Sequence, residues 1–71
     1  MQSRYAQTAE HRGVALKLIG DWQDLCAYYE GDDDNVWAFN VCTGRFSNCG
    51  EAEYFRRHFA NHWRGRLFDV L

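Results

Sequence analysis

The pattern of apolar and polar residues alternates most regularly at 36–41. Apolar side chains recur there at every second position, at Trp37, Phe39 and Val41. A period of two places such side chains on one face of a β-strand. Thr43 and Gly44 then form a natural turn into a second short segment at 45–47. The pattern predicts a strand over 36–41 with a hairpin return after it.

The last third of the chain follows a helical period. Its apolar residues recur at spacings of three and four, at Ala52, Phe55, Phe59 and Trp63. Such spacing lines one face of an α-helix. Asn48 followed three residues later by Glu51 resembles a capping box, and Gly65 suits the left-handed conformation that ends many helices. We therefore predict an amphipathic helix over about 49–64.

The segment 14–29 fits two structures. Its apolar residues have helical spacing at Leu18, Trp22, Leu25 and Tyr29, but its last part also suits a strand before a turn. In the first structure a helix runs up to about Gly20 and a strand follows, so that the acidic stretch 31–35 is a hairpin tip. In the second structure Asp21 caps a short helix over 22–30 and the acidic stretch is a loop. We favour the first.

Together these elements predict an α+β fold in a single compact domain over 1–71. It would consist of an N-terminal helix, a two- to three-stranded antiparallel hairpin or meander, and a C-terminal amphipathic helix. Residues 66–71 would form a docked tail or an edge strand. A chain of 71 residues buries only about 60% of its unfolded surface, yet 17% of its residues are aromatic. We therefore expect partly exposed rings and an interface, with a larger partner or in a homodimer.

The net charge of −2 conceals an uneven distribution. Residues 1–35 hold three basic and seven acidic side chains, a charge of −4, whereas residues 36–71 hold five basic and three acidic ones, a charge of +2. The acidic half ends in three consecutive aspartates between two aromatic runs. At a turn these carboxylates would project into solvent beside the rings. We predict a partner-binding surface at Tyr28, Tyr29, Glu30, Asp32, Asp33, Asp34 and Trp37.

The basic half suggests an alternative, a nucleic-acid interface on the C-terminal helix. Arginines there are interleaved with aromatic residues, which suits phosphate contacts and base stacking. The candidates are Arg56, Arg57, Arg64 and Arg66. On a helical wheel they form no broad basic stripe, and the isoelectric point near 5.8 is low for a phosphate-binding protein. Direct nucleic-acid binding is therefore the weaker interpretation.

Cys42, Cys49, His58 and His62 outline a second alternative, a zinc site that stabilises the domain. Two histidines four residues apart share one side of a helix and can reach one ion. The six residues between the cysteines and the eight before His58 depart from the usual zinc-finger spacing. We therefore predict no metal and no cofactor. With Cys26 the chain has three cysteines, and this odd number favours reduced thiols in a cytosolic protein.

No catalytic constellation stands out, so we expect a non-enzymatic interaction protein of the cytoplasm. Acidic residues beside rings can dock into a groove lined by lysine or arginine, and such grooves are common on proteins that handle nucleic acid. The chain would inhibit or modulate a complex of that kind. Its general profile, a small acidic single domain, is similar to that of phage and mobile-element inhibitors of host defence, anti-CRISPR proteins among them. The N-terminus lacks the apolar core of a signal peptide.

Overall fold

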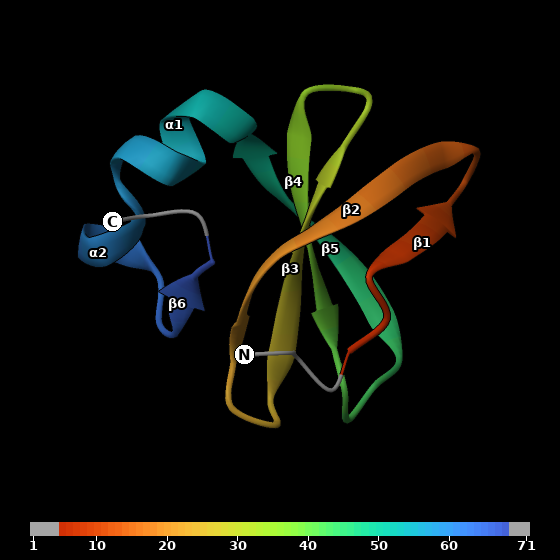
Figure 1. Ribbon diagram of the computed structural model, residues 1–71, viewed down its shortest axis with the longest axis horizontal. Helices are drawn as coiled ribbons and strands as arrows, with labels where there is room; N and C mark the ends of the chain where they lie inside the picture. Colours follow the sequence, from red (N-terminus) through yellow and green to blue (C-terminus); the bar gives the residue numbers. More distant parts are fainter. Residues whose placement is uncertain (1–4, 69–71) are drawn as a thin grey trace.

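The computed structural model describes residues 5–68 as a curved antiparallel sheet with two short helices (Figure 1). The strands are β1 Thr8–His11, β2 Val14–Trp22, β3 Cys26–Gly31, β4 Asn35–Asn40, β5 Arg45–Glu51 and β6 Arg66–Leu67. The helices are α1 Ala52–Arg57 and α2 Phe59–His62. Strands β1 to β5 form a meander in which each pairs with the next, and β6 pairs with β2. The sheet dominates, so the predicted α+β layout with a helix at each end is wrong.

Buried residues form a core on both faces of the sheet. The helix-side cluster, packed by α1 and β6, contains Ile19, Tyr28, Val36, Ala52, Phe55 and Leu67. The inner cluster, enclosed by the sheet itself, contains Leu16, Leu18, Ala27 and Tyr29. Neighbouring residues of a strand point to opposite faces, so a strand between two cores is buried at consecutive positions. This is the situation of residues 27–29 in β3.

The predicted N-terminal helix is wrong because residues 14–22 form the long strand β2. The register of β2 against β3 shifts between Leu18 and Gly20. Leu18 lies in the inner cluster, whereas Ile19 lies in the helix-side cluster. This change of phase breaks the period of two, and the helically spaced residues fall in different elements, with Leu18 and Trp22 in β2 and Tyr29 in β3. Glycine is required at 20, because a Cβ there would overlap the carbonyl oxygen of Arg66 in β6.

The predicted helix over 49–64 has wrong bounds. Its first residues, 49–51, belong to β5. His58, with φ −110° and ψ 17°, separates α1 from α2. Asn48 does not form a capping box: its Oδ1 accepts a hydrogen bond from the N–H of Gly50 at 2.6 Å, within the strand. The helical signal therefore covered the end of a strand and two short helices.

The apolar face of α1 agrees with the prediction. Ala52 and Phe55 point into the helix-side cluster and are 7% and 0% exposed. The helices span six and four residues, and within residues 5–68 no helix has the length and hydropathy needed to cross a membrane.

Residues 66–67 pair with β2, which confirms the strand alternative for the start of this segment. The N–H of Phe68 also donates to the carbonyl oxygen of Ile19 at 2.8 Å. Residues 69–71 of the predicted tail lie outside the described residues. Figure 1 shows α1, α2 and β6 gathered on one side of the meander.

Candidate functional site

The acidic stretch forms the tip of the β3–β4 hairpin, as predicted. Glu30 and Val36 are opposite each other in the two strands, and residues 32–34 lie in the turn. Asp34 has a left-handed φ of 67°, and its N–H donates to the carbonyl oxygen of Gly31 at 3.1 Å. All three aspartates are exposed. The turn therefore presents three carboxylates to solvent on adjacent residues.

Two backbone hydrogen bonds outside the hairpin hold this acidic tip, residues 32–34, in place. The N–H of Asp32 donates to the carbonyl oxygen of Ala15 in β2 at 3.0 Å. The carbonyl oxygen of Asp34 accepts from the N–H of Ala52 at the start of α1 at 2.8 Å. Because the tip is joined to two neighbouring elements, its backbone is ordered before any partner arrives.

Asp33 fixes the indole of Trp37 beside the tip. Its carboxylate accepts hydrogen bonds from the backbone N–H and the side-chain Nδ2 of Asn35, both at 3.2 Å, and from Trp37 Nε1 at 3.3 Å. Partial loss of solvent opposes ionisation, but the hydrogen bonds from Asn35 and Trp37 outweigh it and hold the pKa of Asp33 below its usual range. The carboxylate therefore stays charged at neutral pH while it orients the ring.

Trp37 begins a surface of half-buried rings, three of which also pack against the inner cluster. We call this surface the aromatic shoulder; it consists of His11, Trp37, Phe39 and Phe46. The ring of His11 in β1 lies 5.2 Å from Trp37 and 4.8 Å from Phe46 in β5, centroid to centroid. The outer strands β1 and β5 thus approach each other through rings. Sequence reasoning missed three of these four residues, although the alternation of Trp37 and Phe39 placed both on one face.

Tyr28 and Tyr29 do not belong to the surface site predicted from the sequence. Their exposed fractions are 2% and 3%, and each phenol donates to a backbone carbonyl oxygen at 2.8 Å, Tyr28 to Arg64 and Tyr29 to Ala6. Burial raises the pKa of both phenols. Both rings are core residues because the sheet has a buried cluster on each face, so they offer almost no contact area to a partner of the acidic tip.

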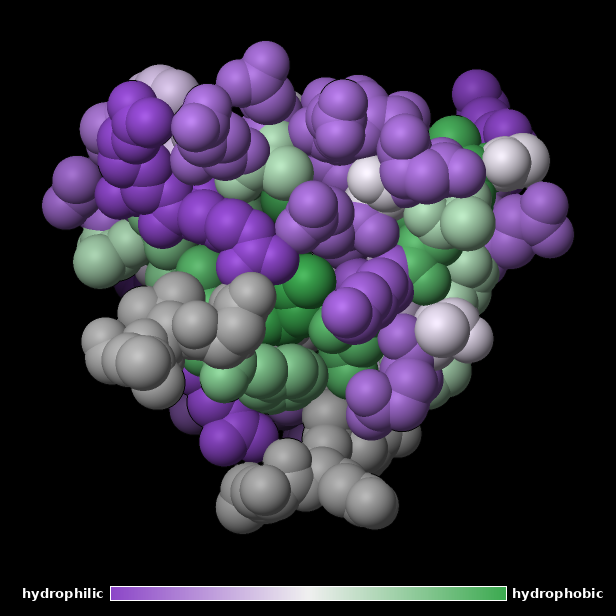
Figure 2. Space-filling view, turned by 45° about the horizontal axis from the view of Figure 1, so that its top comes forward, coloured by the Kyte–Doolittle hydropathy of each residue, from purple (hydrophilic) through white to green (hydrophobic). Residues whose placement is uncertain are grey.

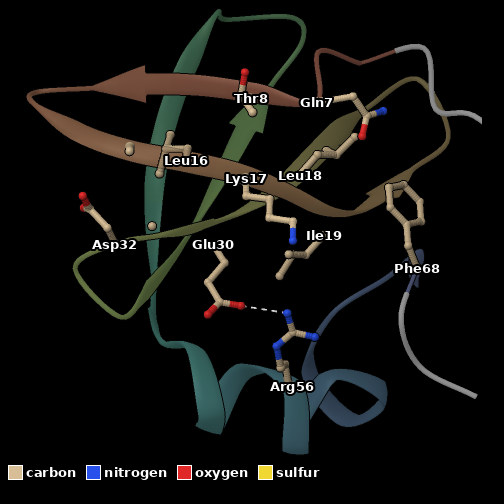
Figure 3. A pocket seen from close by; sticks show the side chains of 12 residues that line it. Gln7, Thr8, Leu16, Lys17, Leu18, Ile19, Glu30, Asp32, Arg56 and Phe68 are labelled. Carbon is tan, nitrogen blue, oxygen red and sulfur yellow. Dashed lines mark hydrogen bonds and ion pairs between the residues drawn. The ribbon is translucent and has the colours of Figure 1, made fainter.

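Glu30 differs from the tip carboxylates because it has a basic partner. Its Oε1 accepts from Nη2 of Arg56 in α1 at 2.7 Å, with the two side chains 36% and 31% exposed. Figure 3 shows both side chains pointing into a hollow between β2 and α1, with Lys17 directed into the same space. The hollow measures about 810 Å³ and also includes Asp32. Arg56 and Glu30 therefore neutralise each other there, and Lys17 and Asp32 are the other charged residues of the lining.

This end of the molecule is strongly hydrophilic. Figure 2 shows polar residues surrounding a hollow with an apolar floor. The floor includes Leu18 and Ile19 of β2, and Phe68 lies at its margin with 42% of its surface exposed. A partner that approaches the acidic tip from this side meets charged groups before any apolar surface.

The four arginines of the predicted nucleic-acid interface each contact a different group. Arg56 pairs with Glu30, and Arg57 lies 3.6 Å from Glu53 on α1. Arg64 lies over the ring of Trp22, with Cζ 5.5 Å from the ring centroid. Arg66 donates to Oδ1 of Asp21 at 3.1 Å and lies over Phe68. The predicted helix over about 49–64 would have carried Arg64, but the chain leaves α2 after His62.

The four residues of the zinc alternative are not brought together. Cys42 is exposed in the β4–β5 turn, whereas Cys49 packs against the helix-side cluster. Burial raises the pKa of the Cys49 thiol to about 11, which disfavours the thiolate that binds metal. The rings of His58 and His62 lie 6.2 Å apart. Within residues 5–68 no three His, Cys, Asp or Glu side chains gather in a way that could hold a metal ion.

Comparison with known proteins adds no relative to this picture. The chain matches no protein-family model, no curated protein and no solved structure at a significant level.

Proposed function

We propose that this chain is a non-enzymatic interaction module that docks its acidic tip and aromatic shoulder onto a basic groove of a larger, nucleic-acid-handling complex. The observation that carries the proposal is the junction of the two surfaces. The carboxylate of Asp33 holds the Trp37 indole, so negative charge and a half-buried ring lie side by side on an ordered turn. The turn and the ring would engage one partner together.

The chemistry of the junction suits arginine and lysine. A guanidinium group forms paired hydrogen bonds with a carboxylate and also stacks on an aromatic face. Asp32 and Asp34 supply exposed carboxylates, and Trp37 supplies the preferred ring for cation–π contact. The charges speed association and select basic partners, whereas the rings supply most of the contact area.

The size of the molecule requires both surfaces. A stable interface takes about 800 Å² from each partner, roughly a sixth of the 5049 Å² of accessible surface of this chain. Three aspartates in one turn cannot supply that area alone. The aromatic shoulder adjoins the tip through Trp37 and extends the contact to β1 and β5.

The proposed biological effect is inhibition or modulation by competition. A groove that accepts carboxylates and rings in this arrangement also binds the phosphates and bases of nucleic acid. Occupation by this chain would exclude the nucleic acid. That mode of action matches the general profile of phage-encoded inhibitors such as anti-CRISPR proteins.

A pair of charge-matched double variants tests the proposal. Asp32→Asn with Asp34→Asn removes two tip charges while asparagine tolerates the left-handed backbone at 34. Glu10→Gln with Glu53→Gln removes two exposed charges elsewhere. Each tagged protein is incubated with lysate of the native host at about 50 mM salt, and captured proteins are quantified by mass spectrometry.

We expect wild type and the Glu10/Glu53 variant to capture a nucleic-acid-binding protein in equal amounts. The Asp32/Asp34 variant should capture at least fivefold less of it. Added nucleic acid should displace the captured protein. Equal capture by both variants would contradict the proposal. So would capture that persists when a nucleic acid bound by the captured protein is present in excess.

A further inference from the structure

A second groove lies at the other end of the β3–β4 hairpin, beside α2. It measures about 570 Å³, and its wall contains Trp22, Leu25, Tyr28, Trp63 and Arg64. Its remaining lining includes Asn40, Ser47 and His62. We call this site the aromatic groove. The volume falls within the range of about 300–1,000 Å³ that small-molecule sites occupy.

The charge of the aromatic groove is opposite to that of the acidic tip. Arg64 and His62 are its basic residues, and the residues of 5–68 that line it include no aspartate or glutamate. The chain as a whole has a net charge of −2, so this lining departs from the average surface. A ligand with an anionic group would find its complement here.

The backbone places Arg64 over Trp22. The carbonyl oxygen of Arg64 accepts the phenol hydrogen of Tyr28 at 2.8 Å, which ties this residue to the floor of the groove. Gly65 follows with φ 102°, and a Cβ there would overlap the carbonyl oxygen of Asp21. Gly65 therefore does not end a helix, as the sequence suggested; it allows the chain to cross β2 closely after Arg64 has been positioned.

The rings of the groove are supported from behind. The ring of Trp63 lies 5.3 Å from Phe55 and 6.4 Å from Tyr28, centroid to centroid. Phe55 is fully buried, so Trp63 rests on the helix-side cluster while part of its surface remains exposed. Trp22 is also half-buried. Half-exposed indoles on a packed core form rigid surfaces on which a planar group can stack.

Polar atoms near the rings suit the edge of a planar group. The Oδ1 of Asn40 accepts hydrogen bonds from the backbone N–H groups of Cys42 and Thr43 at 2.8 and 3.1 Å. Its Nδ2 is the half of the amide that can donate to a ligand. Ser47 adds a hydroxyl group to the lining. The groove thus combines flat apolar walls, neutral hydrogen-bonding groups and a basic rim.

A peptide strand fits this arrangement less well. Peptides commonly add to a free sheet edge, where main-chain hydrogen bonds supply affinity. The floor of the groove comes from β3 and β4, and each of these strands is already paired on both sides. The groove therefore favours a ligand that binds by stacking.

We propose that the aromatic groove binds one nucleotide unit of single-stranded nucleic acid. The base stacks against the indole of Trp63, and the adjoining phosphate lies at the guanidinium group of Arg64, which covers the ring of Trp22. This is a separate surface from the acidic tip, so the inference extends the proposed function and does not depend on it. Only one or two phosphates meet a basic group, which gives a slope of about −0.7 to −1.4 in a plot of log affinity against log salt.

The test uses fluorescein-labelled octathymidylate and the full chain, with binding followed by fluorescence anisotropy. Arg64→Gln removes the guanidinium group at the groove. Arg57→Gln is the matched control, since it removes the same charge from a side chain 67% exposed on α1. We expect saturable binding by wild type, weakened about five- to tenfold by Arg64→Gln and less than twofold by Arg57→Gln. Circular dichroism confirms that both variants fold.

Three results would overturn the inference. Equal weakening by the two variants would show that the chain attracts DNA by overall charge only. Failure of octathymidylate to saturate the protein at low salt would exclude the site. Displacement of octathymidylate by the tripeptide Gly-Gly-Phe at a lower concentration than by thymidine monophosphate would assign the groove to a peptide carboxylate instead.

Discussion

The two ends of the β3–β4 hairpin carry opposite charge and are built differently. The tip holds Asp32, Asp33 and Asp34, whereas the other end, at Cys26 and Asn40, borders the aromatic groove with Arg64. Strands of six residues separate them by about 20 Å, at a rise of about 3.3 Å per residue. This exceeds the Debye length of about 8 Å at physiological salt, so each end acts on its own ligand.

The ends also differ in what holds them in place. Backbone hydrogen bonds from Asp32 and Asp34 to β2 and α1 hold the acidic tip. Ring packing against Phe55 and Tyr28 holds the groove. Hydrogen bonds of the first kind tolerate side-chain changes at the surface, whereas ring packing is sensitive to the loss of any one ring. Substitutions that change the charge of the acidic tip should therefore lower the stability little, whereas substitutions that remove a ring at the aromatic groove should lower it strongly.

The largest expected effect is that of Phe55→Ala. Phe55 is fully buried and its ring contacts those of Tyr28, Phe59 and Trp63. Removing it costs about 3–5 kcal/mol, whereas a domain of this size has roughly 4–11 kcal/mol in total. Urea unfolding followed by circular dichroism would show the loss of stability.

Tyr54→Ala is the control for Phe55→Ala. Tyr54 is 57% exposed and stacks on His58 at 4.3 Å, so its removal should cost less than about 1 kcal/mol. If Phe55→Ala unfolded the helices while the indole N–H resonance of Trp37 kept its native position, the two ends would be independent folding units. We expect them to unfold together, because β3 contributes to both clusters.

A matched pair of tyrosine substitutions gives a smaller effect. Tyr28→Phe removes the hydrogen bond to the Arg64 carbonyl oxygen, and Tyr29→Phe removes the one to the Ala6 carbonyl oxygen, each 2.8 Å long. Each should cost about 1 kcal/mol, or a fall of about 4–8 °C in Tm. Only Tyr28→Phe should also change the environment of Trp22 and Arg64, measured by tryptophan fluorescence and octathymidylate binding. Equal effects of both variants on these two measurements would contradict the conclusion that the two ends of the hairpin act independently.

Several elements could be predicted from the sequence because one local signal determined each. The Gly-Asp-Asn turn and the alternation at Trp37 and Phe39 predicted the β3–β4 hairpin, and Thr43-Gly44 predicted the return into β5. The long strand β2 could not be predicted, because the register shift at Leu18–Gly20 moves its apolar residues from one face to the other. At the same place β2 pairs with β6, which comes from the far end of the chain.

The site was predictable to the same extent. The position of the acidic tip follows from turn chemistry, which is local. The burial of Tyr28 and Tyr29 does not, since it requires both faces of β3 to be covered, one by α1 and β6 and the other by the curved sheet. The aromatic groove joins Trp22 of β2 to Trp63 and Arg64 beyond α2, and no spacing in the sequence indicates that meeting.

The smallest expected effect concerns the link between Asp33 and Trp37 at the tip. The pKa of Asp33 is lower in the folded protein than its ordinary value near 3.9, so the hydrogen bonds to the charged carboxylate are complete above that value. They are lost as the pH falls through the lower folded value. The indole N–H resonance of Trp37, identified with Trp37→Phe, should shift in this acidic range in the wild-type protein. Asp33→Asn should abolish the shift, and the neighbouring Asp32→Asn should retain it. Because Asp33 is exposed, the global stability should hardly change. An indole resonance that titrates identically in Asp33→Asn would show that Trp37 is held by His11 and the shoulder, and the tip would then carry charge without orienting a ring.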